Sequence, residues 1–441
     1  MAPVIGSVQP SNVPMRPAAP RQGGMTVSTF LKQAALALFF VFCMHPVSIG
    51  VGVGVNYTFV LLPLFVVLAQ GRLQYPGGML TMFATFYVLV FFIATLYQVD
   101  LFAMSAWRFG SFLIFMSMFS YAFITIDADK IAAFKASVVV ISVYLSLESA
   151  FVLLEASTGK IVGFEAKDLV GTQRIGFIYL IALWLAYLDP PIKRLLGLFR
   201  YPVLLVLLAG LVLTFSRSSI VSLFVGFLLF ALVKHGNLLR RLSARALLNG
   251  VATIVGIIAF GLILFWLFPV AFQFFDVRLL SFLTNEGDVV TALNSRESSE
   301  GARVYIAMNV IEFVIRNPFT GSGYLGVWTI PGLPAGSAHG QYMDVLFRTG
   351  PIGFLCYLSI FYAVLRYLRR GQEALFWGVL SAGIYGLFHE TFKESQGAFI
   401  YAFLVGMMAQ SLRDRRKARR RAEHVHARPT GEPSAATHVT T

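Results

Sequence analysis

Arg217 lies between two apolar segments and has serines on both sides, in the stretch LTFSRSSIVS. An arginine at membrane depth is costly and usually has a partner. The hydroxyls of Ser216 and Ser218, together with the free N–H groups of a helix start, can bind an anion. We therefore predict an anion site at Arg217. The alternative is an arginine that snorkels from a helix end to the membrane surface.

Arg303 opens the helix predicted in SSEGARVYIAMNVIEFVIRNP, and Arg296 precedes it in the same polar segment. Helix N-termini attract anions, so a cation there is misplaced unless an anion joins it. The pattern indicates a bound phosphate and leaves open which of the two arginines contacts it. A solvated loop arginine is the alternative.

His339 comes directly before an apolar segment, in HGQYMDVLFRTGPIG. A neutral imidazole near a membrane surface can take a proton from a hydroxyl group. A structural histidine at the interface is the alternative interpretation.

The same stretch contains residues that shape the helix after His339. Asp344 and Arg348 are one helical turn apart and can form an ion pair. Gly350, Pro351 and Gly353 follow, and this run predicts a bend.

Two further polar groups interrupt apolar segments. Glu148 lies inside VYLSLESAFVLLEAS, and an ionisable residue within a span is a functional candidate by default. A contact with a basic residue on a neighbouring helix explains Glu148 equally well. His389 and Glu390 begin a second stretch, HETFKES, at the turn between the last two predicted spans.

Membrane helices must position these residues. Of the 441 residues, 57% are hydrophobic and 13% are charged, whereas soluble domains are about 25% charged. The mean hydropathy is +0.74. This composition excludes a soluble enzyme and predicts an all-α polytopic membrane protein. Basic cytoplasmic loops, and not nucleic-acid binding, then explain the net charge of +14.

Apolar segments long enough to span a bilayer predict about twelve transmembrane helices. Their approximate ranges are 29–45, 56–70, 78–98, 108–126, 135–154, 174–189, 201–216, 218–234, 250–269, 342–366, 374–389 and 396–412.

The Lys and Arg residues between these spans fall in alternate loops, which places both termini in the cytoplasm. We expect a disordered cytoplasmic tail at 1–27, a transmembrane bundle at 28–412 and a basic disordered cytoplasmic tail at 413–441. A long outer loop, at 270–341, lies within the bundle domain. Loops of this length are usually functional.

The outer loop contains one predicted amphipathic helix, which Ser299 can cap and Pro318 ends. We expect it to lie on the membrane or to pack over the bundle. Its apolar face is predicted from spacings of three and four residues. The members of that face are Val304, Ala307, Met308, Ile311, Val314 and Ile315.

Motifs for metal or cofactor binding do not occur in the sequence, so neither is expected. There is no phosphate-binding P-loop, no zinc-helix motif and no Asp-X-Asp pair in an outer loop. Cys43 and Cys356 both lie in apolar runs, which argues against a disulfide. Arginines, which are always charged and bind oxygens bidentately, would then neutralise a diphosphate without metal.

At these residues the sequence resembles the O-antigen ligase and Wzy-type polysaccharide polymerase family. The shared pattern is a histidine followed by two spaced glycines, here His339, Gly350 and Gly353. An arginine in a serine-rich junction (TFSRSS) and another before a loop helix that ends in NPFTGSG complete it. The family usually has Asn, Ser or Gln after the histidine, whereas this chain has Gly340. The side-chain contact that orients the imidazole is therefore absent or supplied by Gln341.

The resemblance implies a metal-independent, inverting glycosyl transfer at the periplasmic face of the bacterial inner membrane. The donor would be a glycan on undecaprenyl diphosphate. Arg217 and Arg303 would bind the diphosphate, helped by Arg296, Ser216 and Ser218. His339 would act on the acceptor hydroxyl. Supporting residues would be Glu148, Gln341, Tyr342, Arg348, Gly350 and Gly353.

Three functions remain open. A polymerase would join lipid-linked repeat units into exopolysaccharide or O-antigen, with a lipid-linked glycan as acceptor, and we favour it. An O-antigen ligase would transfer the glycan to lipid A-core. A lipid-linked glycan transporter or flippase is disfavoured because few ionisable residues lie in mid-membrane. Membrane lipid is an expected partner, as are a chain-length regulator and a flippase of the same pathway.

Overall fold

The computed structural model describes residues 27–44, 48–51, 53–56, 117–157, 175–214, 216–234, 299–319, 321–322, 325–333, 338–391 and 395–426. The first elements are α1 (Val27–Met44), β1 (Ser48–Val51), β2 (Val53–Asn56), α5 (Ala128–Ser157) and α7 (Gly176–Leu188). They are followed by α8 (Pro190–Leu196), η3 (Gly197–Phe199), α9 (Arg200–Leu213) and α10 (Arg217–Lys234). The remainder are α15 (Ser299–Arg316), η6 (Val327–Thr329), α16 (Gln341–Leu368), α17 (Glu373–Tyr385) and α18 (Ser395–His426).

One short hairpin departs from the predicted all-α class. Strands β1 and β2 pair antiparallel, with Ser48 opposite Asn56 and Val51 opposite Val53. The stretch SIGVGVGVN alternates valine or isoleucine with glycine. Branched side chains favour extended backbone and glycine disfavours helix, so this segment does not extend α1. The other regular elements among the described residues are helices.

Several predicted spans are helices of the structure. Among the described residues, four helices are long and apolar enough to cross a membrane: Ala128–Glu155, Pro190–Leu213, Arg217–Lys234 and Gln341–Leu368. A shorter apolar helix is Gly176–Leu188. The predicted spans 78–98 and 250–269, residues 57–70 of the span 56–70 and residues 108–116 of the span 108–126 lie outside the described residues. The number of twelve therefore stays a prediction.

Helix α7 forms the centre of the described bundle. Every residue from 176 to 186 is buried, as expected for a helix that is apolar all round and surrounded by others. Gly378 of α17 packs so closely that a Cβ there would lie 2.9 Å from the Cα of Ile181. The indole Nε1 of Trp184 donates to Ser381 Oγ at 2.9 Å. Small residues thus let α7 and α17 approach closely.

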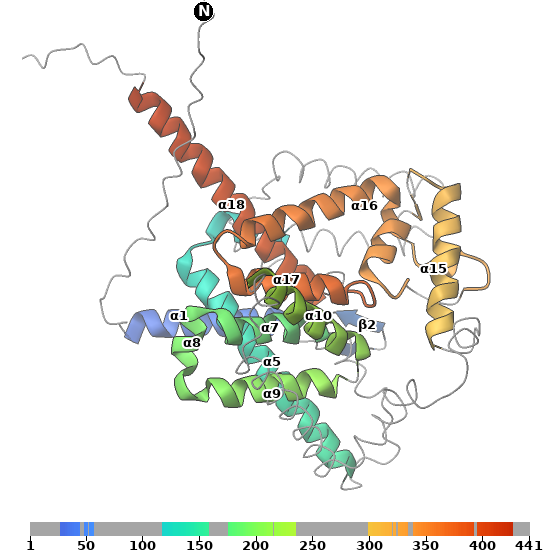
Figure 1. Cartoon of the computed structure of the whole chain (residues 1–441), viewed down its shortest axis with the longest axis horizontal. Coiled ribbons are helices and arrows are strands. Elements are labelled where there is room, and N and C mark those ends of the chain that lie inside the picture. The colour runs from blue at the N-terminus through green and yellow to red at the C-terminus, as the bar shows by residue number, and fades with distance from the viewer. Residues whose placement is uncertain are drawn as a thin grey trace, which may run out of the picture.

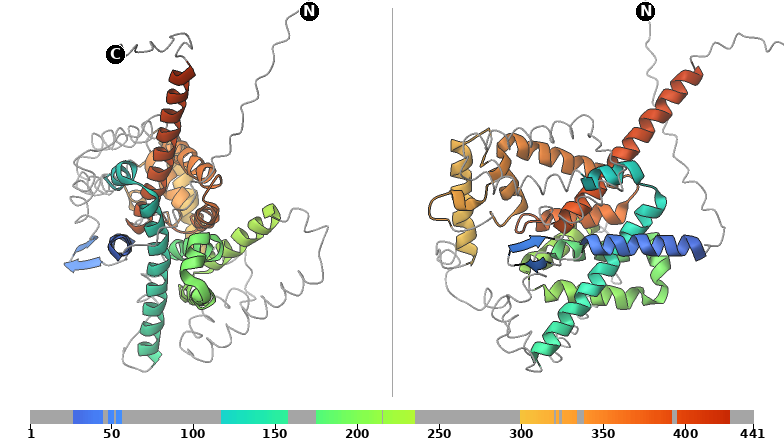
Figure 2. Two further views of the ribbon diagram at one scale, coloured as in Figure 1. Left: turned by 90° about the vertical axis from the view of Figure 1, so that its left-hand side faces the viewer. Right: turned by 180° about the vertical axis from the view of Figure 1, so that it is seen from behind.

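The bundle has two chemically different ends. At the basic end, Lys135 pairs with Asp189 at 2.6 Å and Lys234 pairs with Glu373 at 2.9 Å. The basic part of α18 projects from this side, and α15 lies crosswise at the other side of the molecule (Figure 1). Figure 2 shows the same separation from behind. This arrangement agrees with a segregation of basic residues to one membrane side, which we expect to be the cytoplasm.

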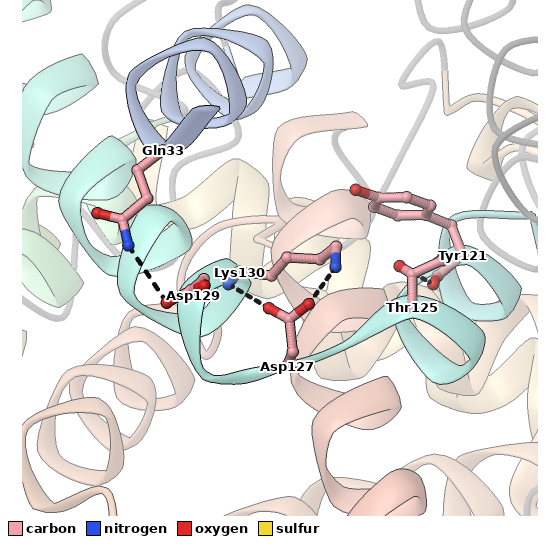
Figure 3. Close-up of polar contacts among 6 residues, drawn as sticks. All are labelled: Gln33, Tyr121, Thr125, Asp127, Asp129 and Lys130. Carbon is pink, nitrogen blue, oxygen red and sulfur yellow. Dashed lines mark hydrogen bonds and ion pairs between the residues drawn. The ribbon is translucent and has the colours of Figure 1, made fainter. Parts of the chain in front are cut away.

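The start of α5 is held by polar contacts (Figure 3). Asp127 accepts from the backbone N–H of Lys130 at 2.8 Å and forms an ion pair with the Lys130 side chain. Burial raises the pKa of the Asp127 carboxyl, but these hydrogen bonds outweigh that effect and the net pKa is lowered. Gln33 of α1 donates to Asp129 at 3.2 Å and joins α1 to α5.

Helix α18 extends into the segment predicted as a disordered tail. Residues 413–426 continue the helix to His426. Arg, Lys, Ala and Glu are strong helix formers, and Arg419 pairs with Glu423 one turn away at 2.9 Å. Composition alone suggested a tail because the segment has no apolar face.

Of the apolar face predicted for α15, Val314 packs on α16 and most of the other members are exposed. The helix begins at Ser299 and ends before Pro318, as predicted. Its buried residues are Ile306, Val310 and Val314, whereas Met308 and Ile315 are exposed by 66% and 71%. The helix carries two apolar stripes, and spacing alone does not indicate which one meets α16. The exposed stripe suits a helix that also touches the membrane surface.

Candidate functional site

The end of the bundle opposite the basic end contains a polar junction of α10, α16 and the turn after α17. Ser216 precedes α10, and its Oγ lies 2.8 Å from Ser218 Oγ and 3.4 Å from Nε2 of His389. Arg217 lies between these serines and is partly buried. The predicted serine–arginine group is therefore a compact start of a helix, with a second imidazole beside it.

The start of α16 attaches to the same turn. The backbone N–H of Gln341 donates to the carbonyl oxygens of Gly386 at 2.8 Å and His389 at 3.2 Å. The side-chain oxygen of Gln341 accepts from the N–H of Thr391 at 3.0 Å. His339 lies two residues before Gln341, so these bonds fix the segment that carries it.

Close packing explains why position 340 is a glycine in this chain. A Cβ at this position would lie 2.8 Å from the carbonyl oxygen of Leu387. A side chain therefore does not fit without moving the turn after α17. The side-chain oxygen of Gln341 accepts from the N–H of Thr391, so this side chain is attached to the turn after α17, and its orienting role for His339 stays a prediction.

His339 adopts an uncommon backbone conformation. Its φ is +59°, and its side chain is exposed. Positive φ is rare outside glycine and costs free energy, although histidine tolerates it better than most residues. Such conformations persist where surrounding contacts impose them, often at functional sites. Here the bonds of Gln341 and the close packing of Gly340 impose it.

The predicted bend in α16 is confirmed. The turn that follows α15 packs against this bend. Gly350 has φ +66° and ψ −178° in the middle of α16. The N–H of Ser322 donates to the carbonyl oxygen of Phe347 at 2.7 Å. Gly321, with φ +57°, is so close that a Cβ there would lie 2.2 Å from the same oxygen. Gly321 of the turn after α15 and Gly350 of α16 thus lie on the two sides of one backbone contact.

Arg303 is the fifth residue of α15, one turn after the start of the helix, and is partly buried. Ile306, one turn later, belongs to an apolar cluster that also contains Ala338 and Phe347. Phe313 packs on Phe347 with ring centroids 5.0 Å apart. Packing of α15 on the first part of α16 therefore connects the helix of Arg303 to the segment of His339. Arg296 lies outside the described residues.

Other candidates have structural contacts. Arg348 pairs with Asp344 at 2.6 Å, as predicted, with both side chains buried. Tyr342 donates to the carbonyl oxygen of Gly383 at 2.9 Å. Gly353 is buried in α16 after the bend. Glu148 is exposed on α5, whereas the described contacts of the junction come from α10, α16 and the turn after α17.

The sequence did not predict a role for His389. Its position in the polar stretch HETFKES, at a turn between two spans, was the available signal. Its contact with Ser216 joins residues 173 positions apart. A contact between such distant residues cannot be predicted from a single sequence.

The fold and the junction define a polytopic helical membrane protein with a basic, hydroxyl- and imidazole-bearing site at one end. Residues 202–358 match the family described as O-Antigen ligase. The matched segment contains Arg217, Arg303 and His339, so the resemblance to the O-antigen ligase and Wzy-type family is confirmed there. No curated protein matches the chain. The match over residues 202–358 and the apolar helices together suggest a bacterial membrane protein with a function of the ligase or polymerase type.

Proposed function

We propose that this protein is a glycosyltransferase of the bacterial inner membrane that polymerises undecaprenyl-diphosphate-linked repeat units at the periplasmic face. One observation carries the proposal. The segment that matches the O-antigen ligase family contains Arg217 and His339. The turn at His389 contacts both Ser216, beside Arg217, and Gln341, beside His339.

In the proposed reaction, Arg217 and Arg303 bind the diphosphate of the donor. Ser216 and Ser218 add hydroxyl donors, and the N-terminus of α10 adds backbone N–H groups and a favourable dipole. Guanidinium groups suit this role because they are permanently charged and bind oxygens bidentately. They stabilise the charge that develops on the leaving diphosphate.

The acceptor hydroxyl attacks the anomeric carbon from the side opposite the diphosphate. His339 takes the proton of that hydroxyl, a new carbon–oxygen bond forms, and the bond to the phosphate oxygen breaks. The diphosphate leaves with the electron pair, and the single displacement inverts the anomeric carbon. The exposed side chain of His339 is suited to meet an acceptor that arrives from outside the bundle.

An O-antigen ligase is the second candidate, favoured by the description of the matching family. It would use the same donor chemistry and differ in the acceptor, which would be lipid A-core. The two functions leave different intermediates when the gene is deleted. Single lipid-linked repeat units accumulate without a polymerase, whereas long lipid-linked chains accumulate without a ligase.

The deciding experiment deletes the gene in the source bacterium and separates the lipid-linked glycans by size. Accumulation of single repeat units supports polymerisation, and long chains support ligation. If neither accumulates and the surface polysaccharide is unchanged, the proposed function is wrong. Cysteine labelling at position 339 from the periplasmic side tests the expected orientation.

A further inference from the structure

His389 lies where the elements that carry Arg217 and His339 meet. Its backbone N–H donates to the carbonyl oxygen of Tyr385 at 3.1 Å, which turns the chain back after α17. The imidazole stacks on the Tyr385 ring, with centroids 4.8 Å apart and planes 17° apart. The position of the His389 imidazole is therefore fixed by its contacts with Tyr385 in the same turn.

The side chain of His389 reaches α10. Its Nε2 atom lies 3.4 Å from Ser216 Oγ, which in turn lies 2.8 Å from Ser218 Oγ. Ser216 is buried, with 6% of its surface exposed. These contacts flank Arg217 on both sides, so the imidazole restrains the backbone from which the guanidinium extends.

The backbone of His389 reaches α16. Its carbonyl oxygen accepts from the N–H of Gln341 at 3.2 Å, and Gly386 accepts from the same group at 2.8 Å. One residue thus contacts α10 through its side chain and the start of α16 through its main chain.

We propose that His389 is a positioning residue that holds Arg217 in place relative to His339. The inference rests on the proposed transfer reaction, since it explains how the diphosphate-binding group and the proton acceptor keep their separation. A misplacement of about 1 Å can lower a rate about 100-fold. A single bond between two helices is therefore enough to matter to the rate while contributing little to folding.

Two substitutions separate positioning from simple packing. His389→Phe keeps a ring to stack on Tyr385 and loses the bond to Ser216. His389→Gln keeps a polar group near the position of Nε2 and loses the ring. A residue that only packs would tolerate Phe better than Gln, whereas the proposal expects the opposite order.

The test uses full-length protein in membranes and, as donor, the lipid-linked glycan extracted from the deletion strain. We expect His389→Phe to lower the rate about 10- to 100-fold with unchanged melting temperature and protein level. His389→Gln should stay within about threefold of wild type, which corresponds to loss of less than one ordinary hydrogen bond. Ser216→Ala should also lower the rate, since it removes both a proposed hydroxyl donor to the diphosphate and the contact with His389. Adding His389→Phe to it should lower the rate no further, because that contact is already lost.

Arg217→Ala, measured in parallel, separates the two claims. If Arg217→Ala is as active as wild type, the proposed function itself fails. If Arg217→Ala is inactive while His389→Phe is fully active, only the positioning role fails. The positioning role is also overturned if the rate losses of Ser216→Ala and His389→Phe multiply in the double variant. It is equally overturned if His389→Gln has a rate no higher than that of His389→Phe. Should His389→Phe fold poorly, the Ser216→Ala and Gln variants still decide the outcome.

Discussion

The backbone N–H of Ser322 donates to the carbonyl oxygen of Phe347 at 2.7 Å and closes the turn after α15 onto the bend of α16. The bond joins the NPFTGSG segment to the segment between His339 and Gly353, the two stretches on which the resemblance to the family partly rests. At this contact Gly321 and Gly350 let the two backbones approach closely.

Gly321→Ala tests this contact. The new Cβ would lie 2.2 Å from the Phe347 oxygen, and φ is +57°. We expect α15 to shift, with a loss of transfer rate of about 100-fold, measured as product per amount of protein in membranes. Gly332→Ala is the matched control, because φ there is +80° but nothing lies within 4 Å of the Cβ. Equal losses in both variants would mean that backbone strain, and not the contact, matters.

Arg217→Ala should lower product formation by about 100- to 1000-fold, the usual effect of removing one charge-stabilising contact. Protein level should be unchanged. Arg217→Lys should recover part of the rate, since the charge returns without the bidentate geometry. Arg316→Ala serves as control because Arg316 is exposed and, among the described residues, pairs along its own helix with Glu312 at 2.5 Å. Full-length polysaccharide from the Arg217→Ala strain would contradict the site assignment.

Gly340→Asn would restore a residue common in the family, yet we expect loss of activity. A Cβ at this position would lie 2.8 Å from the Leu387 oxygen, and a displaced turn would move His339. Gly371→Ala is the control, since its Cβ would meet nothing within 4 Å. A Gly340→Asn variant more active than wild type would show that the turn after α17 adapts readily. Product formation and melting temperature distinguish the outcomes.

Arg348→Ala should destabilise the protein by about 3–5 kcal/mol, because it leaves the buried carboxylate of Asp344 without its ion-pair partner. Replacing both residues by apolar ones of similar size should restore much of the loss. The measurement is unfolding in detergent at a fixed pH near neutrality. Removal of the exposed Glu312–Arg316 pair should cost at most about 1 kcal/mol.

Local patterns in the sequence predicted the features that depend on neighbours in the chain. Hydropathy located α7 and α10, and spacing predicted the Asp344–Arg348 pair and the bend at Gly350. Each of these depends on residues within one helix or one turn.

Features that depend on distant segments were missed. Spacing predicted one apolar stripe of α15 and did not indicate the second, which packs on α16. The steric demand at Gly340 comes from Leu387, and the contact of Ser216 comes from His389. The sequence identified these residues without indicating which of them meet.

The short length of α7 affects how deep the junction lies. Its 13 residues cover about 20 Å at about 1.5 Å per residue, whereas the hydrocarbon core of a bilayer is about 30 Å thick. A Cβ at Gly176, its first residue, would touch Ser219 and the ring of Tyr385, both next to the junction. With the other end of α7 at the cytoplasmic boundary, we expect Arg217 to lie below the plane of the lipid headgroups. At that depth little water separates charges, so a guanidinium attracts a diphosphate more strongly than it would at an open surface.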